Sequence, residues 1–122
     1  MGMRALMFAL MVFPSAAAGQ PPDRMAILRN VASYIGLSEF CVAHGVDYRP
    51  LASRMRHGIT EQLRGSPGGE DLEFRRWDRA GRRAVLYNAS RNEVVNLVES
   101  IAEFRQFCTS AQQYLTTISQ IK

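Results

Sequence analysis

The chain has 122 residues, with 15 lysines and arginines against 11 aspartates and glutamates, which gives a formal charge of +4. This length is enough for one domain and too short for two of ordinary size. The mild positive charge does not indicate nucleic-acid binding, which normally shows as a strongly basic domain. A weakly basic protein of this kind is better suited to an anionic lipid, an anionic polymer or an acidic protein.

The first eighteen residues show the order of features that is typical of a secretory signal peptide. Arg4 supplies the leading charge, residues 5–13 (ALMFALMVF) are an unbroken apolar run, Pro14 ends the run, and residues 15–18 (SAAA) are small. A membrane-spanning helix needs about 20 apolar residues, so this run is too short to be one. We expect a signal peptide at 1–18, a single helical domain at 19–122 with no membrane span, and a periplasmic or secreted protein.

Two helices are expected in the first half of the exported domain. Asp23 is a suitable N-cap for a first helix that Gly45 ends. Its apolar residues cover nearly all faces, which is typical of a helix buried among its neighbours. Pro50 suits the first turn of a second helix, where its missing N–H costs nothing. This second helix has one apolar stripe, which indicates a surface position.

A third helix is expected after the linker 65–69 (GSPGG), which is a strong turn signal. The acidic segment 70–73 (EDLE) suits a helix N-terminus, where negative charge is favourable. Apolar and small residues then share one face as far as Asn88, so the third helix is expected to end there. Phe74 and Trp77 lie on that face and are expected to belong to the core.

Two more helices are expected in the last part of the chain. Ser90 followed by Glu93 is a capping-box pattern and predicts a fourth helix with Cys108 near its end. Thr109 followed by Gln112 repeats the pattern and predicts a last helix. The sequence leaves open whether the third and fourth helices are continuous. No segment alternates with period two, so the expected fold class is all-α: a compact bundle of four to five helices, without strands, with one disulfide.

That disulfide is expected between Cys41 and Cys108, because an even number of cysteines in a small exported domain is ordinarily paired. The bond would close a loop of 67 residues, and this closure contributes about 4 kcal/mol in the chain-entropy model. Both cysteines are placed late in their helices by the pattern. The two helices would therefore have to run roughly parallel or to cross.

Five arginines within nine residues form the most conspicuous functional pattern. On a helix they share one face, where guanidinium groups can bind oxyanions with two hydrogen bonds each. The alternative is an ordinary solvated helix face, partly neutralised by Asp78 and by the acidic segment 70–73. The candidate contacts for an anion or a partner are Arg75, Arg76, Arg79, Arg82 and Arg83.

No residues indicate a catalytic, metal or cofactor site. His44, Asp47 and His57 lack the spacing of a metal-ligand set, and no serine or carboxylate pair has a catalytic setting. We expect no enzyme activity, no metal and no cofactor. The favoured interpretation is an exported protein that binds an envelope protein, an anionic lipid or an anionic polymer. The alternatives are an inhibitor or immunity protein of a secreted enzyme, and a small enzyme.

Three short segments carry a resemblance to other proteins: Cys41 with the preceding 35–37 (IGL), the pair Arg54 and Met55, and 108–111 (CTSA). In this pattern the chain resembles a family of small exported two-cysteine helical proteins of unknown function from alphaproteobacteria. The resemblance implies a signal peptide followed by a helical domain with two cysteines. It implies no activity.

Overall fold

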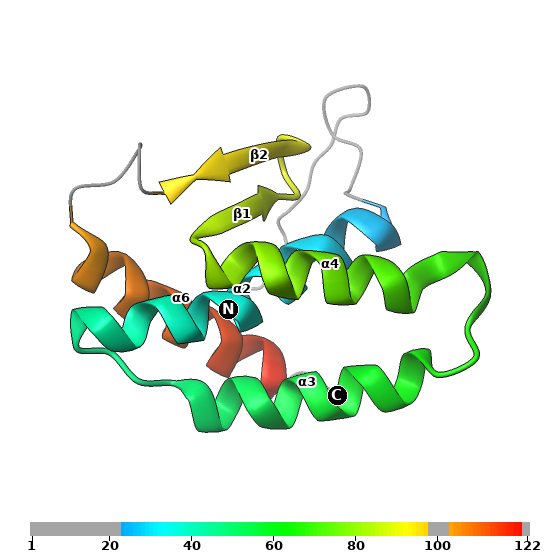
Figure 1. Cartoon of the computed structure of the whole chain (residues 1–122), viewed down its shortest axis with the longest axis horizontal. Helices are drawn as coiled ribbons and strands as arrows, with labels where there is room; N and C mark the ends of the chain where they lie inside the picture. The colour runs from blue at the N-terminus through cyan, green and yellow to red at the C-terminus, as the bar shows by residue number, and fades with distance from the viewer. Residues whose placement is uncertain (1–22, 98–102, 121–122) are drawn as a thin grey trace, which may run out of the picture.

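Figure 1 shows a computed structural model of the chain, which describes residues 23–97 and 103–120. The predicted signal peptide, 1–18, lies outside these ranges and stays a prediction. The described elements are α2 (Arg24–Cys41), η1 (Val42–His44), α3 (Arg49–Leu63), η2 (Pro67–Gly69), α4 (Glu70–Arg82), β1 (Val85–Asn88), β2 (Glu93–Asn96) and α6 (Phe104–Ser119). The described part is mostly helical, with one two-stranded sheet.

Helix α2 lies at the centre of the structure and contacts α3, α4, α6 and β1 (Figure 1). The Asp23 side chain caps it by accepting a hydrogen bond from the N–H of Ala26 at 2.7 Å. Ile35 and Leu37 are completely buried. Gly45, with a left-handed φ of +84°, follows the short η1 turn and ends the helical segment. The predicted start, end and central burial of the first helix are therefore confirmed.

The second and third predicted helices have their core faces where the sequence indicated. Pro50 lies in the first turn of α3, and this helix buries Ala52 and Leu63. On α4, Phe74 and Trp77 are 2% and 8% exposed, which confirms their prediction as core residues.

Two glycines allow α2 and α4 to approach unusually closely. A Cβ added at Gly36 of α2 would lie 1.9 Å from the main-chain oxygen of Asp78, and a Cβ added at Gly81 of α4 would lie 1.9 Å from that of Ser33. Both distances are far inside a van der Waals contact, so only glycine fits at either position without moving a helix. The two backbones are in direct contact at this crossing.

The structure corrects the third predicted helix, which ends at Arg82 and not at Asn88. Ala84 has φ of +63°, a left-handed conformation that commonly ends α-helices. Its N–H donates a hydrogen bond to the carbonyl oxygen of Gly81 at 2.8 Å, which closes the last turn. The residues that follow are extended and form β1, whose branched and aromatic side chains suit a strand.

The predicted fourth helix, from Ser90 to near Cys108, is also wrong at its start. Ser90 lies in a turn and Glu93 begins β2, which pairs antiparallel with β1. Asn88 Oδ1 accepts a hydrogen bond from the N–H of Arg91 at 3.1 Å, which stabilises the turn. The predicted helical character is confirmed, since the described part is mostly helical, but the expectation that no strands form is wrong. The third and fourth predicted helices are not continuous, because the hairpin lies between them.

Side chains of α2 take the place of a third strand beside β1. The N–H of Tyr87 donates to Ser33 Oγ at 3.2 Å, and the carbonyl oxygen of Tyr87 accepts from Asn30 Nδ2 at 2.7 Å. A free strand edge would leave both main-chain groups without a partner. These two bonds satisfy the edge and hold the hairpin against α2.

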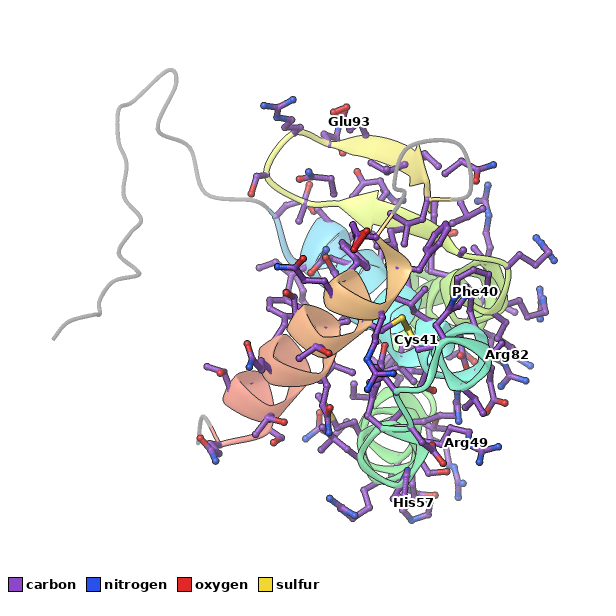
Figure 2. All side chains as sticks on the ribbon, turned by 90° about the vertical axis from the view of Figure 1, so that its left-hand side faces the viewer. Phe40, Cys41, Arg49, His57, Arg82 and Glu93 are labelled. Carbon is purple, nitrogen blue, oxygen red and sulfur yellow. A yellow bond between two sulfur atoms is a disulfide. The ribbon has the colours of Figure 1, made fainter. Side chains whose placement is uncertain are left out.

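The predicted disulfide is confirmed: Cys41 and Cys108 are bonded, and both are buried (Figure 2). The placement of Cys108 late in a fourth helix is wrong, because it lies in the first turns of α6. Thr109 is not a cap. Its hydroxyl donates to the carbonyl oxygen of Arg105 inside α6 at 3.1 Å.

The corrected position of Cys108 also changes the expected orientation of the two bonded helices. Phe40, near the end of α2, packs edge-on against Phe104 at the start of α6, with ring centroids 5.4 Å apart. Asn30, early in α2, accepts a hydrogen bond from the hydroxyl of Tyr114 late in α6. The helices therefore run antiparallel, and the disulfide joins the end of one to the start of the other.

Substitution of Gly36 by alanine is expected to lower the free energy of unfolding by about 3 kcal/mol, because the new Cβ would overlap the oxygen of Asp78. Gly58 of α3 is a matched control, since a Cβ there meets no atom within 4 Å. Gly58→Ala is expected to raise the free energy of unfolding by up to about 1 kcal/mol. Urea denaturation measures the free energy of unfolding of both variants. An equal change in the two variants would contradict the close crossing of α2 and α4.

Removal of the disulfide by Cys41→Ser together with Cys108→Ser is expected to lower the free energy of unfolding by about 4 kcal/mol. The physical reason is that the bond closes a loop with a sequence separation of 67. Urea denaturation of the double variant and of the oxidised protein gives this value. An unchanged denaturation midpoint would show that the bond adds nothing to the non-covalent packing of α2 on α6.

Candidate functional site

Helix α4 has a core face and, opposite to it, an outward face that carries the predicted arginines. The core face packs on α2 and includes Phe74, Trp77 and Gly81. All the candidate arginines are exposed, and all lie on α4 or at its C-cap: Arg75, Arg76, Arg79, Arg82 and Arg83. The structure therefore brings the sequence-predicted contact residues together on one helix.

Charge along α4 changes from acidic to basic. The first turn contains Glu70, Asp71 and Glu73, and the last turn contains Arg79 and Arg82. Carboxylates near a helix N-terminus and cations near its C-terminus both interact favourably with the helix dipole. This order of charges stabilises α4 in the absence of any ligand.

Three of the five arginines pair with a carboxylate one turn earlier on the same helix. The pairs are Arg75 with Asp71 at 3.8 Å, Arg76 with Glu73 at 3.5 Å, and Arg82 with Asp78 at 3.6 Å. The pairs of Arg75 and Arg76 lie at the surface, where an ion pair contributes only about 0–1 kcal/mol. Their spacings of three and four residues are visible in the sequence, so these pairings could have been predicted.

Arg79 and Arg83 are different, because neither side chain has an ion pair or hydrogen bond with another residue of 23–97 or 103–120. They lie four residues apart, so their side chains are neighbours on successive turns. Only two of the five arginines are therefore free of a carboxylate partner. Arg79 and Arg83 form the centre of the face that could bind an anion.

A leucine extends the line of this unpaired pair along α4. Leu72 is 62% exposed, more than any other large hydrophobic residue in the described ranges. It precedes Arg79 by seven residues and Arg83 by eleven, which places each arginine about 20° from Leu72 around the helix axis, on opposite sides of it, and all three within about 40°. We call Leu72, Arg79 and Arg83 the outer line of α4.

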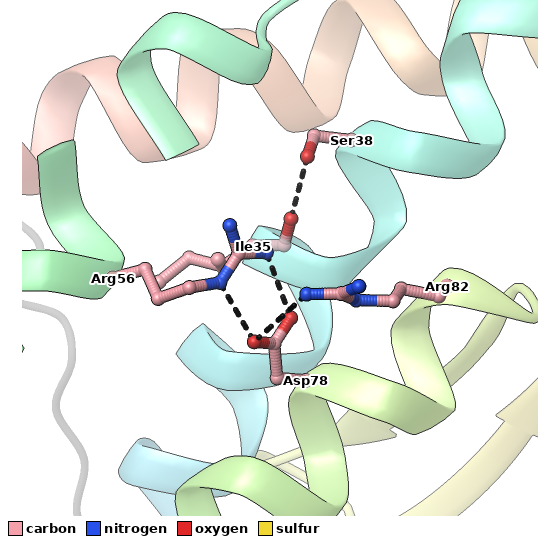
Figure 3. A network of polar contacts seen from close by, with 5 residues as sticks. All are labelled: Ile35, Ser38, Arg56, Asp78 and Arg82. Atoms are coloured by element: carbon pink, nitrogen blue, oxygen red, sulfur yellow. Dashed lines mark hydrogen bonds and ion pairs between the residues drawn. The ribbon is translucent and has the colours of Figure 1, made fainter. Parts of the chain in front are cut away.

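Asp78 ties α4 to α3 and is the most buried carboxylate in the described ranges, with 6% exposure. It accepts hydrogen bonds from Nε and Nη2 of Arg56 at 2.7 and 2.9 Å, and Arg82 lies beside it (Figure 3). Two parallel bonds between a guanidinium and a carboxylate are strong and directional. The hydrogen bonds that Arg56 donates to Asp78 raise the pKa of Arg56. Arg82 is therefore part of the network that joins α4 to α3 through Asp78 and Arg56.

Glu73 joins α4 to α2 beside the hairpin. It accepts a hydrogen bond from Nε of Arg29 at 2.7 Å, and the Arg29 guanidinium lies over the ring of Tyr87 at 5.4 Å. The same carboxylate pairs with Arg76, whose guanidinium lies over the ring of Trp77 at 5.7 Å. The hydrogen bond from Arg29 is the main cause that lowers the pKa of Glu73. Sequence reasoning missed the role of Arg29, because its partner is far away in the chain.

A cavity of about 450 Å³ lies between α2, α6 and the hairpin, a volume in the range of small-molecule sites. None of the described residues that line it is charged, and they include Asn30, Tyr34, Leu86 and Tyr114. Burial raises the pKa of Tyr34, and raises that of Tyr114 to about 12. Both hydroxyls therefore stay protonated at neutral pH. No sequence pattern indicated this cavity.

The weak metal candidates of the sequence have other contacts. The ring of His44 packs on that of Phe40 at 4.8 Å, and His57 is exposed on α3 (Figure 2). The Asp47 carboxylate accepts two hydrogen bonds from Arg49 at 2.9 Å, which lower its pKa to about 2. In the described part of the chain, no three His, Cys, Asp or Glu side chains are grouped so that they could hold a metal ion.

Comparisons with models of protein families, with curated proteins and with solved structures find no match. The resemblance to small exported two-cysteine proteins therefore stays a prediction. Among the residues that the structure describes, no helix combines the length and the apolar character needed to cross a membrane.

Acid is expected to destabilise the protein partly through Glu73, whose pKa in the folded state is below the ordinary value of 4.5. A carboxylate with a lowered pKa stabilises the fold above its unfolded-state pKa, and this contribution is lost as the pH falls through the folded-state pKa. The free energy of unfolding, measured with urea at pH 7 and at pH 3, should therefore decrease less in Glu73→Gln than in the wild type.

Glu61→Gln is the control for that experiment, because Glu61 forms an exposed pair with Arg64 on α3. It removes one carboxylate without touching the bond between Arg29 and Glu73. An identical pH dependence in Glu73→Gln and in the wild type would rule out this role of Glu73.

Proposed function

We propose that this protein is an exported binding protein, periplasmic or secreted, that contacts an anionic partner through the outward face of α4. The observation that carries this proposal is the pair Arg79 and Arg83, which are exposed and have no carboxylate partner in the described ranges. Like charges four residues apart repel each other slightly. An oxyanion placed between them would remove the repulsion and accept hydrogen bonds from both guanidinium groups.

The flanking arginines support the same face. Arg75 and Arg76 are 60% and 68% exposed, and their pairs with carboxylates are longer than 3.4 Å. Weak exposed pairs exchange readily for a stronger anion, because little free energy is lost when they open. The face can therefore widen from two to four guanidinium groups when a large anionic surface approaches.

The proposed location rests on the disulfide and on the leader pattern of residues 1–18. A buried bond between Cys41 and Cys108 is compatible with an oxidising compartment such as the periplasm or the cell exterior. We propose that residues 19–122 form one exported domain of packed helices that includes the hairpin. Binding is favoured over catalysis because none of the described residues that line the cavity carries a carboxylate, an imidazole, a thiol or an ammonium group.

Substitution of Arg79 and Arg83 by glutamine is expected to weaken binding to a polyanion by about thirty-fold, because each arginine near an anionic surface contributes about 1 kcal/mol. Retention on a heparin column, compared by the salt concentration needed for elution, measures this. The free energy of unfolding should change by less than about 0.5 kcal/mol, because lost dipole interaction and relieved repulsion oppose each other.

The matched control is Arg54→Gln with Arg64→Gln, which removes two exposed charges from α3 and its C-cap. This variant is expected to elute close to the wild type. If the control loses as much retention as the α4 variant, the binding depends on net charge and not on this face. If the wild type binds neither heparin nor anionic vesicles at low salt, the proposed function is wrong.

A further inference from the structure

The outer line of α4 contains an apolar side chain that the fold does not use. Leu72 is 62% exposed, although the core face of the same helix, with Phe74 and Trp77, is fully occupied on the opposite side. Transfer of a leucine side chain from water to an apolar phase is favourable. A partner that covers Leu72 with hydrocarbon would therefore gain free energy that a soluble polyanion does not provide.

The carboxylates of α4 do not cancel the positive charge of this line, because each of them is held by an arginine. Two of the three in the first turn bond to arginines of α2, Glu70 to Arg24 at 2.8 Å and Glu73 to Arg29 at 2.7 Å. Arg79 and Arg83 keep their full charge on the outer line. The outer line therefore presents an apolar residue followed by two cations.

The spacing of the outer line fits a flat surface. Helix α4 has 13 residues, and the distance along its axis from Leu72 to Arg83 is about 16 Å at 1.5 Å per residue. A helix that lies in the plane of a bilayer can place all three side chains on the same side. Arginine side chains are long enough to bind phosphate groups while an apolar neighbour enters the region below them.

We infer that α4 docks on the surface of an anionic phospholipid bilayer, with Arg79 and Arg83 on lipid phosphates and Leu72 at the boundary of the acyl chains. This inference rests on the proposed function, since it names the ligand of the same face. Charge complementarity and the exposed leucine on one line favour a lipid surface over a soluble polymer.

The experiment compares binding of the exported protein to three probes: vesicles of phosphatidylcholine with phosphatidylglycerol, vesicles of phosphatidylcholine alone, and heparin. Cosedimentation gives the vesicle affinities and salt elution gives the heparin affinity. The wild type is expected to bind only the phosphatidylglycerol vesicles and heparin. Leu72→Ser should weaken binding to these vesicles about five-fold, through lost apolar burial, and leave heparin retention unchanged.

Val94→Ser is the matched control, because Val94 is 58% exposed and belongs to β2 of the hairpin, not to α4. It should leave vesicle binding unchanged, while Arg79→Gln with Arg83→Gln should weaken binding to both anionic probes. Equal vesicle binding by Leu72→Ser and the wild type, or binding to heparin without binding to vesicles, overturns the bilayer inference and leaves the proposed function in place. Absence of binding to both anionic probes overturns both.

Discussion

The contact between the backbones of α2 and α4 at Gly36 and Gly81 is the constraint on which the rest of the structure depends. Because neither glycine has a Cβ, the crossing brings each helix against a main-chain oxygen of the other. Asp78 provides one of these oxygens, and its side chain is thereby held within reach of Arg56 on α3. With its core side fixed in this way, α4 has only one side left for its arginines, which is the side that faces solvent.

The same crossing decides which arginines are structural and which are free. Arg29 and Arg56 project from α2 and α3 toward α4, and there they meet Glu73 and Asp78. These carboxylates lie beside the core face, so the arginines directly opposite that face are beyond their reach. The sequence shows one cluster of arginines. The packing separates this cluster into arginines that stabilise the fold and arginines whose side-chain hydrogen-bond donors have no partner.

Local signals predicted the parts of the fold that local chemistry decides. Asp23 as a cap, Pro50 in a first turn and the paired cysteines follow from the chemistry of single residues. The hairpin could not be found in this way, because its edge is satisfied by Asn30 and Ser33 of a distant helix. The prediction of Thr109 as a helix cap failed for a related reason. A threonine hydroxyl can cap a helix N-terminus or bond to a carbonyl oxygen within a helix, and the hydroxyl of Thr109 bonds to a carbonyl oxygen within α6.

Rigidity connects this packing to the proposed binding. Helix α2 is held at its end by the disulfide to α6 and along its length by the crossing with α4. Because α4 packs on this fixed α2, its backbone loses little freedom when it binds a partner. The main entropic cost of binding is therefore the ordering of arginine side chains. Long cationic side chains on a fixed backbone adapt to an irregular set of phosphates without any change of fold. Such a face is better matched to an extended anionic surface than to one small ligand, which would need a concave site with converging donors.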